Sequence, residues 1–175
     1  MRFLVLVLFL LNISYAGNFT LMSDIGGQLT TKQVLNGFGC RGENMSPALS
    51  WKDAPKGTKS FAITIYDPDA PTGSGWWHWI VYNIPVTVTS VSNNASALGV
   101  LPKGSLESVT SYGVGGFGGA CPPKGDRAHR YIITVFALNV DKLDLGKTPS
   151  PELVGYNLNA HAIQKSSIIS YYGRE

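Results

Sequence analysis

Three segments of this chain have the residue pattern of β-strands, and turn-forming residues separate them. Residues 59–66 (KSFAITIY), 76–84 (WWHWIVYNI) and 130–138 (RYIITVFAL) are rich in β-branched and aromatic side chains. Glycine, proline and aspartate crowd residues 67–75 (DPDAPTGSG) and 113–126 (GVGGFGGACPPKGD). Such breaks exclude a regular alternation of strands and helices. They predict a mainly β (α+β) fold with an antiparallel core.

Helical signals are confined to the end of the chain. Ser150 is suited to cap a helix that starts with Pro151 and has the acidic Glu152 in its first turn. A second helical stretch is expected over residues 159–172, with Gly173 as the residue that ends it. The sequence therefore predicts C-terminal helices after the strands.

Residues 1–16 (MRFLVLVLFLLNISYA) have the features of a secretory signal peptide. Arg2 precedes an apolar run over residues 3–11, and small side chains stand just before the expected cleavage point. A helix of that run would span only about 14 Å, too little for a membrane anchor. We expect cleavage to leave a single domain, residues 17–175, that is periplasmic or secreted and not stably inserted in a membrane.

The two cysteines of the chain, Cys40 and Cys121, are predicted to form a disulfide. An even number of cysteines in an exported protein favours this pairing, and two buried thiols are the alternative. In the chain-entropy model, a bridge across this separation contributes about 4 kcal/mol to stability. No metal site is expected from two isolated cysteines without paired spacing.

The best candidates for ligand chemistry are four polar residues beside predicted turns. Asp67 and Asp69 lie where the first strand segment meets its turn, and His129 lies at the start of the third. His78 lies inside the second segment. Turns at strand ends commonly form binding sites, so these four side chains define the candidate site.

Strand alternation makes a specific prediction about the two histidines. His78 should share a face of its strand with Trp76 and Ile80, opposite Trp79. His129 should share a face with Tyr131 in the same way.

Three interpretations of these polar residues follow from their chemistry alone. Imidazole N–H groups and glycine amides could bind an anion, with Asp67 accepting from one histidine and fixing its tautomer. Mixed histidine and carboxylate ligation of a metal is the second, although paired ligand spacing is absent. The third is a purely structural role at turns, and the residue types leave all three open.

Signatures of enzymes and of nucleic-acid binding are missing from the sequence. Gly113, Gly115 and Gly118 match GxGxxG, but Pro122 and Pro123 follow and prevent the helix that a dinucleotide site needs. The nucleophile motif GxSxG is absent, so no catalytic residue and no cofactor is predicted. The net charge of +3 comes without a clustered basic face, so no nucleic-acid partner is expected.

Four segments together resemble one known family. They are residues 37–51 (GFGCRGENMSPALSW), 66–85 (YDPDAPTGSGWWHWIVYNIP), 119–138 (GACPPKGDRAHRYIITVFAL) and the terminal SYYGR. Their order and spacing resemble the phosphatidylethanolamine-binding proteins, in particular the bacterial YbhB/YbcL, or Raf-kinase-inhibitor-like, branch. The resemblance extends over nearly all of the expected mature chain.

The resemblance implies an antiparallel β core, a second smaller sheet, C-terminal helices and a small pocket that accepts phosphate, acetate and phosphorylated headgroups. It also implies a cis bond between Ala70 and Pro71. Transferred residue by residue, the ligand-binding positions are Asp67, Pro71, His78, Pro122, His129 and Tyr131, and Trp76 contributes to the pocket wall.

The functional hypothesis is an exported, non-enzymatic binding protein for a small anion or a phosphorylated headgroup, with both histidines donating. The alternative is a protein-interaction or inhibitor module, because some relatives inhibit proteases or kinases. A phosphoester hydrolase that uses the Asp/His cluster is the third possibility. The short segment GSGWW before His78 differs from the longer charged connection of animal relatives, so their kinase-binding surface is not assumed.

Overall fold

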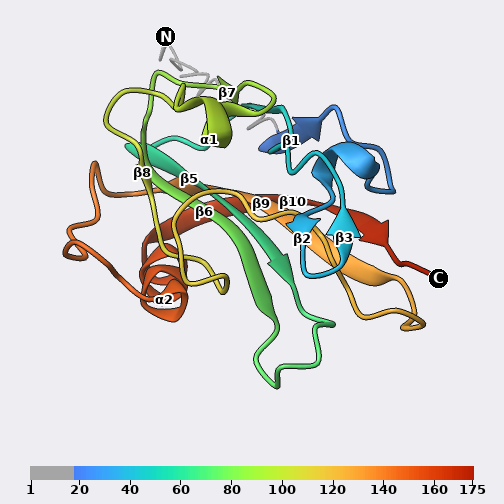
Figure 1. Ribbon diagram of the computed structural model, residues 1–175. Coiled ribbons are helices and arrows are strands. Elements are labelled where there is room, and N and C mark those ends of the chain that lie inside the picture. Colours follow the sequence, from blue (N-terminus) through green and yellow to red (C-terminus); the bar gives the residue numbers. More distant parts are fainter. Residues whose placement is uncertain (1–17) are drawn as a thin grey trace, which may run out of the picture.

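The computed structural model describes residues 18–175 of the chain (Figure 1). The predicted signal peptide, residues 1–16, lies outside the described residues. Within the described part, no helix is long and apolar enough to cross a membrane.

A five-stranded antiparallel sheet forms the centre of the fold. Its strands follow the order β10 (Ala162–Tyr172), β9 (His129–Leu138), β5 (Ser60–Asp67), β6 (Trp76–Pro85) and β8 (Leu106–Glu107). The central strands β9, β5 and β6 confirm the three strand segments predicted from β-branched and aromatic residues. These strands are rich in apolar residues because both of their faces are covered, and this made them predictable from the sequence.

A second, smaller sheet is present, as the resemblance implied. It contains β1 (Thr20–Ser23), β4 (Leu49–Lys52) and β7 (Ser90–Val91) in that order, and all pairs are antiparallel. The remaining elements are the short hairpin β2 (Asn36–Gly37) and β3 (Cys40–Arg41), the 3-10 turn η1 (Thr31–Gln33), and the helices α1 (Ala95–Leu98) and α2 (Pro151–His161).

The large sheet separates two apolar clusters. One cluster fills the space between the two sheets, where Trp51 of β4 packs with Phe61 of β5 and with Trp79 of β6. The other lies on the opposite face, where Leu158 of α2 covers Ile80. The architecture therefore has three layers, with the large sheet in the middle.

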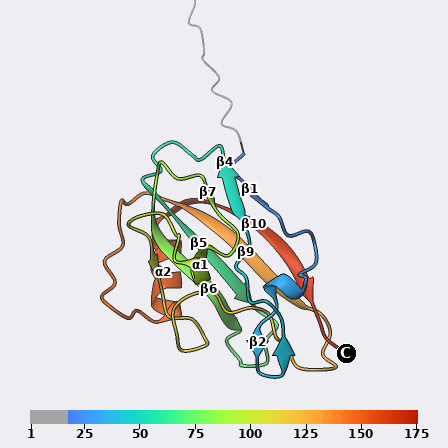
Figure 2. The ribbon, with the colours of Figure 1, turned by 45° about the horizontal axis from the view of Figure 1, so that its top comes forward.

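The end of the chain departs from the prediction. Helix α2 begins as expected, because the Ser150 hydroxyl accepts from the Leu153 main-chain N–H at 3.3 Å and a proline opens the first turn. Residues 162–172 are strand β10, however, so the predicted second helix is wrong (Figure 2). β10 pairs with β9 along its length and satisfies the main-chain groups of that edge. Most of its side chains are exposed, so its sequence shows no clean alternation.

A bulge in β6 overturns the predicted orientation of His78. Ile65 pairs with Trp79 and Tyr66 pairs with Trp77, so His78 is an extra residue between the two pairs. His78 and Trp79 consequently lie on the same side of the sheet, and Ile80 packs on the other side. The shared face predicted for His129 and Tyr131 is confirmed, because β9 pairs with β10 in a regular register over these residues and both side chains line one cavity.

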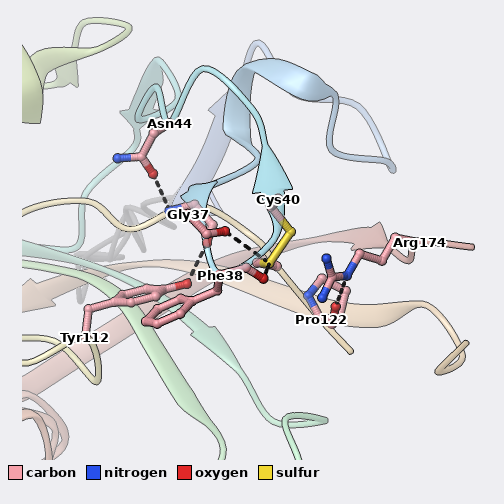
Figure 3. The surroundings of a disulfide bond; sticks show 9 residues. Gly37, Phe38, Cys40, Asn44, Tyr112, Pro122 and Arg174 are labelled. Atoms are coloured by element: carbon pink, nitrogen blue, oxygen red, sulfur yellow. Dashed lines mark hydrogen bonds between the residues drawn. A yellow bond between two sulfur atoms is a disulfide. The ribbon is translucent and has the colours of Figure 1, made fainter. Parts of the chain in front are cut away.

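The predicted disulfide joins Cys40 of β3 to Cys121, with an S–S distance of 2.10 Å and a Cα–Cα distance of 6.0 Å (Figure 3). The bond connects the β2–β3 hairpin to the loop that precedes β9. The cis bond expected between Ala70 and Pro71 is not found, since all peptide bonds of the described residues are trans.

Candidate functional site

A cavity of about 430 Å³ opens where β5 ends and where β6 and β9 begin. All seven residues named from the resemblance line it, namely Asp67, Pro71, Trp76, His78, Pro122, His129 and Tyr131. They come from four separate parts of the sequence. The antiparallel register brings them together, because the end of β5 lies beside the starts of both neighbouring strands.

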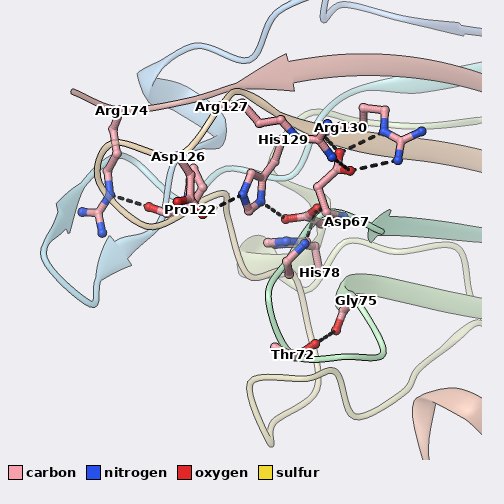
Figure 4. Close-up of polar contacts among 12 residues, drawn as sticks. Asp67, Thr72, Gly75, His78, Pro122, Asp126, Arg127, His129, Arg130 and Arg174 are labelled. Atoms are coloured by element: carbon pink, nitrogen blue, oxygen red, sulfur yellow. Dashed lines mark hydrogen bonds and ion pairs between the residues drawn. The ribbon is translucent and has the colours of Figure 1, made fainter.

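Asp67 and His129 form a buried pair at the base of this cavity (Figure 4). One carboxylate oxygen of Asp67 lies 2.8 Å from Nδ1 of His129, and the other accepts from the main-chain N–H groups of Asp69 and Ala70 at 2.8 and 3.1 Å. An ionised carboxylate has no hydrogen to donate and can only accept. Nδ1 of His129 therefore carries the hydrogen of this bond. This geometry matches a carboxylate that fixes the orientation of a histidine ring.

The second nitrogen of His129 points toward another carboxylate. Its Nε2 lies 3.4 Å from Oδ2 of Asp126, whose side chain is 43% exposed. The contact is long and the aspartate is half in solvent. A ligand that enters the cavity can therefore replace Asp126 at this nitrogen.

His78 is held differently from His129. Its Nδ1 lies 2.7 Å from the main-chain oxygen of Gly118, and its Nε2 is buried with no partner among the described residues. Desolvation lowers the pKa of His78 to about 4 and outweighs the opposing effect of the Gly118 carbonyl and of Asp67. The ring is therefore neutral at neutral pH.

Aromatic side chains form one wall of the cavity. The ring of Tyr112 meets those of Trp76 and His78 edge to face, and Phe38 stacks on it with 6.0 Å between ring centroids. The Tyr112 hydroxyl donates to the Gly119 carbonyl at 2.7 Å, and burial raises its pKa to about 12. This wall is apolar and uncharged toward the ligand.

Tyr131 stands on the floor of the cavity beside His78, with 5.1 Å between the ring centroids. Its hydroxyl is buried and has no partner among the described residues. Burial raises the pKa of this hydroxyl well above its usual range, so it stays protonated and can donate.

Asp69, the fourth polar candidate, does not line the cavity. Its carboxylate accepts from the Nε and main-chain N–H groups of Arg130 at 2.9 Å each, and from Nη2 of both Arg130 and Arg127. The Arg130 side chain holds the pKa of Asp69 well below its usual range. The metal interpretation loses support, because this carboxylate is occupied by arginines.

Comparison with known proteins places the chain in a family. The sequence model of the phosphatidylethanolamine-binding protein family matches residues 25–173. The chain belongs to this family. The match begins just after β1 and ends one residue before Arg174, so it includes the whole five-stranded sheet and every residue that lines the cavity except Arg174.

Two bacterial members of the family are strongly similar in sequence. The protein YbcL of Escherichia coli K12 is 52% identical over 149 residues, which cover 84% of this chain and 81% of YbcL. YbhB of the same organism is 45% identical over 148 residues, covering 84% of this chain and 93% of YbhB.

Solved structures of the family share the fold. The crystal structure of E. coli YbcL, described as a new member of the mammalian PEBP family, superimposes with a TM-score of 0.87 and 49% identity. The match covers 91% of this chain and all of that structure. A Chlamydia trachomatis homologue superimposes with a TM-score of 0.73 at 26% identity, over 90% of this chain and 98% of the other.

The sequence analysis did not predict several residues that lie at this cavity. Phe38, Tyr112 and Arg174 all line the cavity, and Asp126 contacts His129 from its edge. Arg174 lies in the SYYGR segment that helped to identify the family, so a signal for it was present. Phe38 lies in the segment 37–51 that also helped to identify the family, whereas Tyr112 lies in none of the four segments and only the folded chain brings it to the cavity.

Proposed function

We propose that this protein is an exported, non-enzymatic binding protein whose cavity takes a small anion or a phosphorylated headgroup. The observation that supports this most is the joint presence of Arg174 and the buried Asp67–His129 pair in one cavity. Family membership supports a binding function of this kind but does not identify the ligand.

Arg174 supplies permanent positive charge at the cavity mouth. Its Nε donates to the Pro122 carbonyl at 2.5 Å, which anchors the guanidinium beside the rim (Figure 4). In the described part of the chain, no other donor of this side chain has a hydrogen-bond partner. The two Nη groups are therefore suited to bind phosphate or carboxylate oxygens.

His129 supplies the second donor. Asp67 engages Nδ1, so a ring with hydrogens on both nitrogens has its Nε2 hydrogen left for Asp126 or for an anion in the cavity. An anion that displaces Asp126 takes over this hydrogen bond. Both oxygens of Asp67 are already engaged, which limits its repulsion of the anion.

The size and lining of the cavity limit the ligand. A cavity of about 430 Å³ accommodates a headgroup or a small organic anion. It is too small to enclose a lipid with two acyl chains, so the proposal does not include lipid extraction. The disulfide Cys40–Cys121 supports export, because such bonds persist in oxidising compartments.

The test is calorimetric titration with inorganic phosphate and with phosphoethanolamine. We expect His129→Ala to weaken binding at least about tenfold, the effect of losing one charged hydrogen bond. His161→Ala is the matched control, because His161 ends α2 and does not line the cavity. Unchanged affinity in His129→Ala contradicts the proposed site, and turnover of a phosphoester by the wild-type protein contradicts the non-enzymatic assignment.

A further inference from the structure

We propose that the cavity prefers ligands that carry an O–H group, because this group donates a hydrogen bond to His78. The inference rests on the proposed function and narrows it to singly protonated oxyacids, such as the monoanion of a phosphate monoester. Fully ionised sulfate esters of the same shape and charge are excluded.

The tautomer of His78 follows from its partner. A main-chain carbonyl can only accept, so the 2.7 Å contact with Gly118 requires a hydrogen on Nδ1 of His78. A neutral imidazole carries one hydrogen, and in His78 that hydrogen is already used. The remaining nitrogen, Nε2, therefore presents a lone pair and no hydrogen.

The surroundings of His78 keep the ring neutral. The side chain is buried, and the charged or titratable groups near it are Asp67, His129, Tyr112 and Tyr131. Asp67 favours a charged ring, but its carboxylate is already bound by His129 and by two main-chain N–H groups. Desolvation dominates, so His78 does not become a donor at neutral pH.

An unpartnered acceptor in this position carries a free-energy cost unless a ligand satisfies it. Buried polar atoms are nearly always hydrogen-bonded, yet Nε2 of His78 has no partner in the described part of the chain. His78 lines the same cavity as Arg174 and His129. A ligand with one O–H group and several anionic oxygens offers a hydrogen-bond partner of the right kind to each of these three side chains.

Tyr131 complements His78 in this arrangement. Its hydroxyl also lacks a partner among residues 18–175, and it can donate to a ligand oxygen. A protonated phosphate offers both an O–H for His78 and an oxygen for Tyr131. A sulfate ester has only oxygens, and one of them would set its lone pairs against Nε2 of His78.

The experiment compares methyl phosphate with methyl sulfate by calorimetric titration of the intact protein. At about pH 5 both ligands carry one negative charge, because the second pKa of a phosphate ester is about 6, and only the phosphate retains an O–H group. We expect methyl phosphate to bind at least about tenfold more tightly there, the value of one buried hydrogen bond. The preference should shrink as the pH rises to about 8 and the phosphate loses its proton.

Methyl sulfate also serves as the control for the protein's own titration. It does not change charge in this range, so its pH profile reports the protein alone, and the ratio of the two affinities reports the ionisation of the phosphate. Equal binding with a ratio independent of pH overturns the inference and leaves the anion site intact. Failure of both ligands to bind overturns the proposed function as well.

A spectroscopic measurement assigns the effect to His78 without a substitution. In ¹⁵N NMR of histidine-labelled protein, His78 should show the tautomer with hydrogen on Nδ1, and its Nε2 resonance should shift on saturation with methyl phosphate. Methyl sulfate should leave that resonance in place. A hydrogen on Nε2 in the free protein, or an unchanged resonance with bound methyl phosphate, overturns the assignment.

Discussion

Two hydrogen bonds join His78 to Gly118, although these residues are 40 positions apart in the chain. The ring Nδ1 of His78 donates to the Gly118 carbonyl at 2.7 Å, and the Gly118 N–H donates to the His78 carbonyl at 2.9 Å. This pair attaches the glycine-rich loop to the bulge of β6. The orientation of the His78 ring therefore depends on main-chain groups of the glycine-rich loop.

The first prediction concerns Gly118→Ala. A Cβ at this position would lie 2.3 Å from the ring of Tyr112, so the loop or the cavity wall must shift. We expect a loss of about 1–3 kcal/mol in the free energy of unfolding and weaker phosphate binding. Urea denaturation and calorimetric titration measure the two effects. Gly115→Ala is the control, since its Cβ would meet only ordinary contacts from 3.6 Å outward, and equal effects of both variants would contradict the prediction.

The second prediction is a dependence of stability on pH that originates at His78. The folded state depresses its pKa from 6.5 to about 4, so the unfolded chain binds more protons between these values. Stability is therefore full above about pH 6.5 and falls as the pH drops toward 4, by up to about 3 kcal/mol from this group. Urea denaturation across this range measures the slope.

His78→Gln is the matched variant for this pH dependence. It removes the titrating group, so its stability should change less over the same window. Asp69 does not confound the comparison, because its pKa lies well below the usual range and its contribution is lost only in stronger acid. Parallel profiles for the two proteins would refute the role of His78.

The third prediction concerns the disulfide. Replacing both Cys40 and Cys121 by alanine should lower the free energy of unfolding by about 4 kcal/mol, as the chain-entropy model gives for this loop length. Phosphate binding should also weaken, because Cys121 and its neighbour Pro122 line the cavity. A reducing agent should reproduce both effects in the wild-type protein and change nothing in the variant. Reductant-independent stability of the wild type would show that the bond contributes little.

The fourth prediction compares loss of the Asp69 carboxylate, which both arginines bind, with loss of the Arg127 side chain alone. Asp69→Asn removes the charge that Arg130 binds through two side-chain nitrogens, so we expect a loss of about 2 kcal/mol in stability. Arg127→Ala should cost less than about 0.5 kcal/mol, because that side chain is 80% exposed. Thermal and urea unfolding distinguish the two. A larger loss in Arg127→Ala than in Asp69→Asn would contradict this account.

The fifth prediction concerns processing of the leader. Mass spectrometry of protein isolated from the exported fraction should give a chain that begins at Gly17, with one disulfide that disappears on reduction. Retention of residues 1–16 in that fraction would rule out cleavage at this site.

Local chemistry was sufficient to predict the centre of the fold. Strands β5, β6 and β9 are buried over most of their length, so their apolar residues are nearly continuous, and turns rich in proline and glycine separate β5 from β6 and precede β9. The start of α2 was also predictable from the sequence, because the capping residue Ser150 and the first helical residue Pro151 are adjacent in the chain. Motif resemblance named seven residues that the register then placed in one cavity.

Contacts between distant residues decided the rest. Residues 162–172 form a strand because β9 offers them an unpaired edge; Ile168, Ile169 and the two tyrosines favour a strand, but nothing within the segment specifies this partner. The bulge that places His78 on the same side of the sheet as Trp79 depends on how β6 pairs with β5. The alternation of side chains along β6 alone cannot reveal it. The amino-acid sequence alone determined which residue types could bind an anion. The tertiary structure decided which nitrogen of His78 carries a hydrogen, because the Gly118 carbonyl that fixes it comes from another part of the chain.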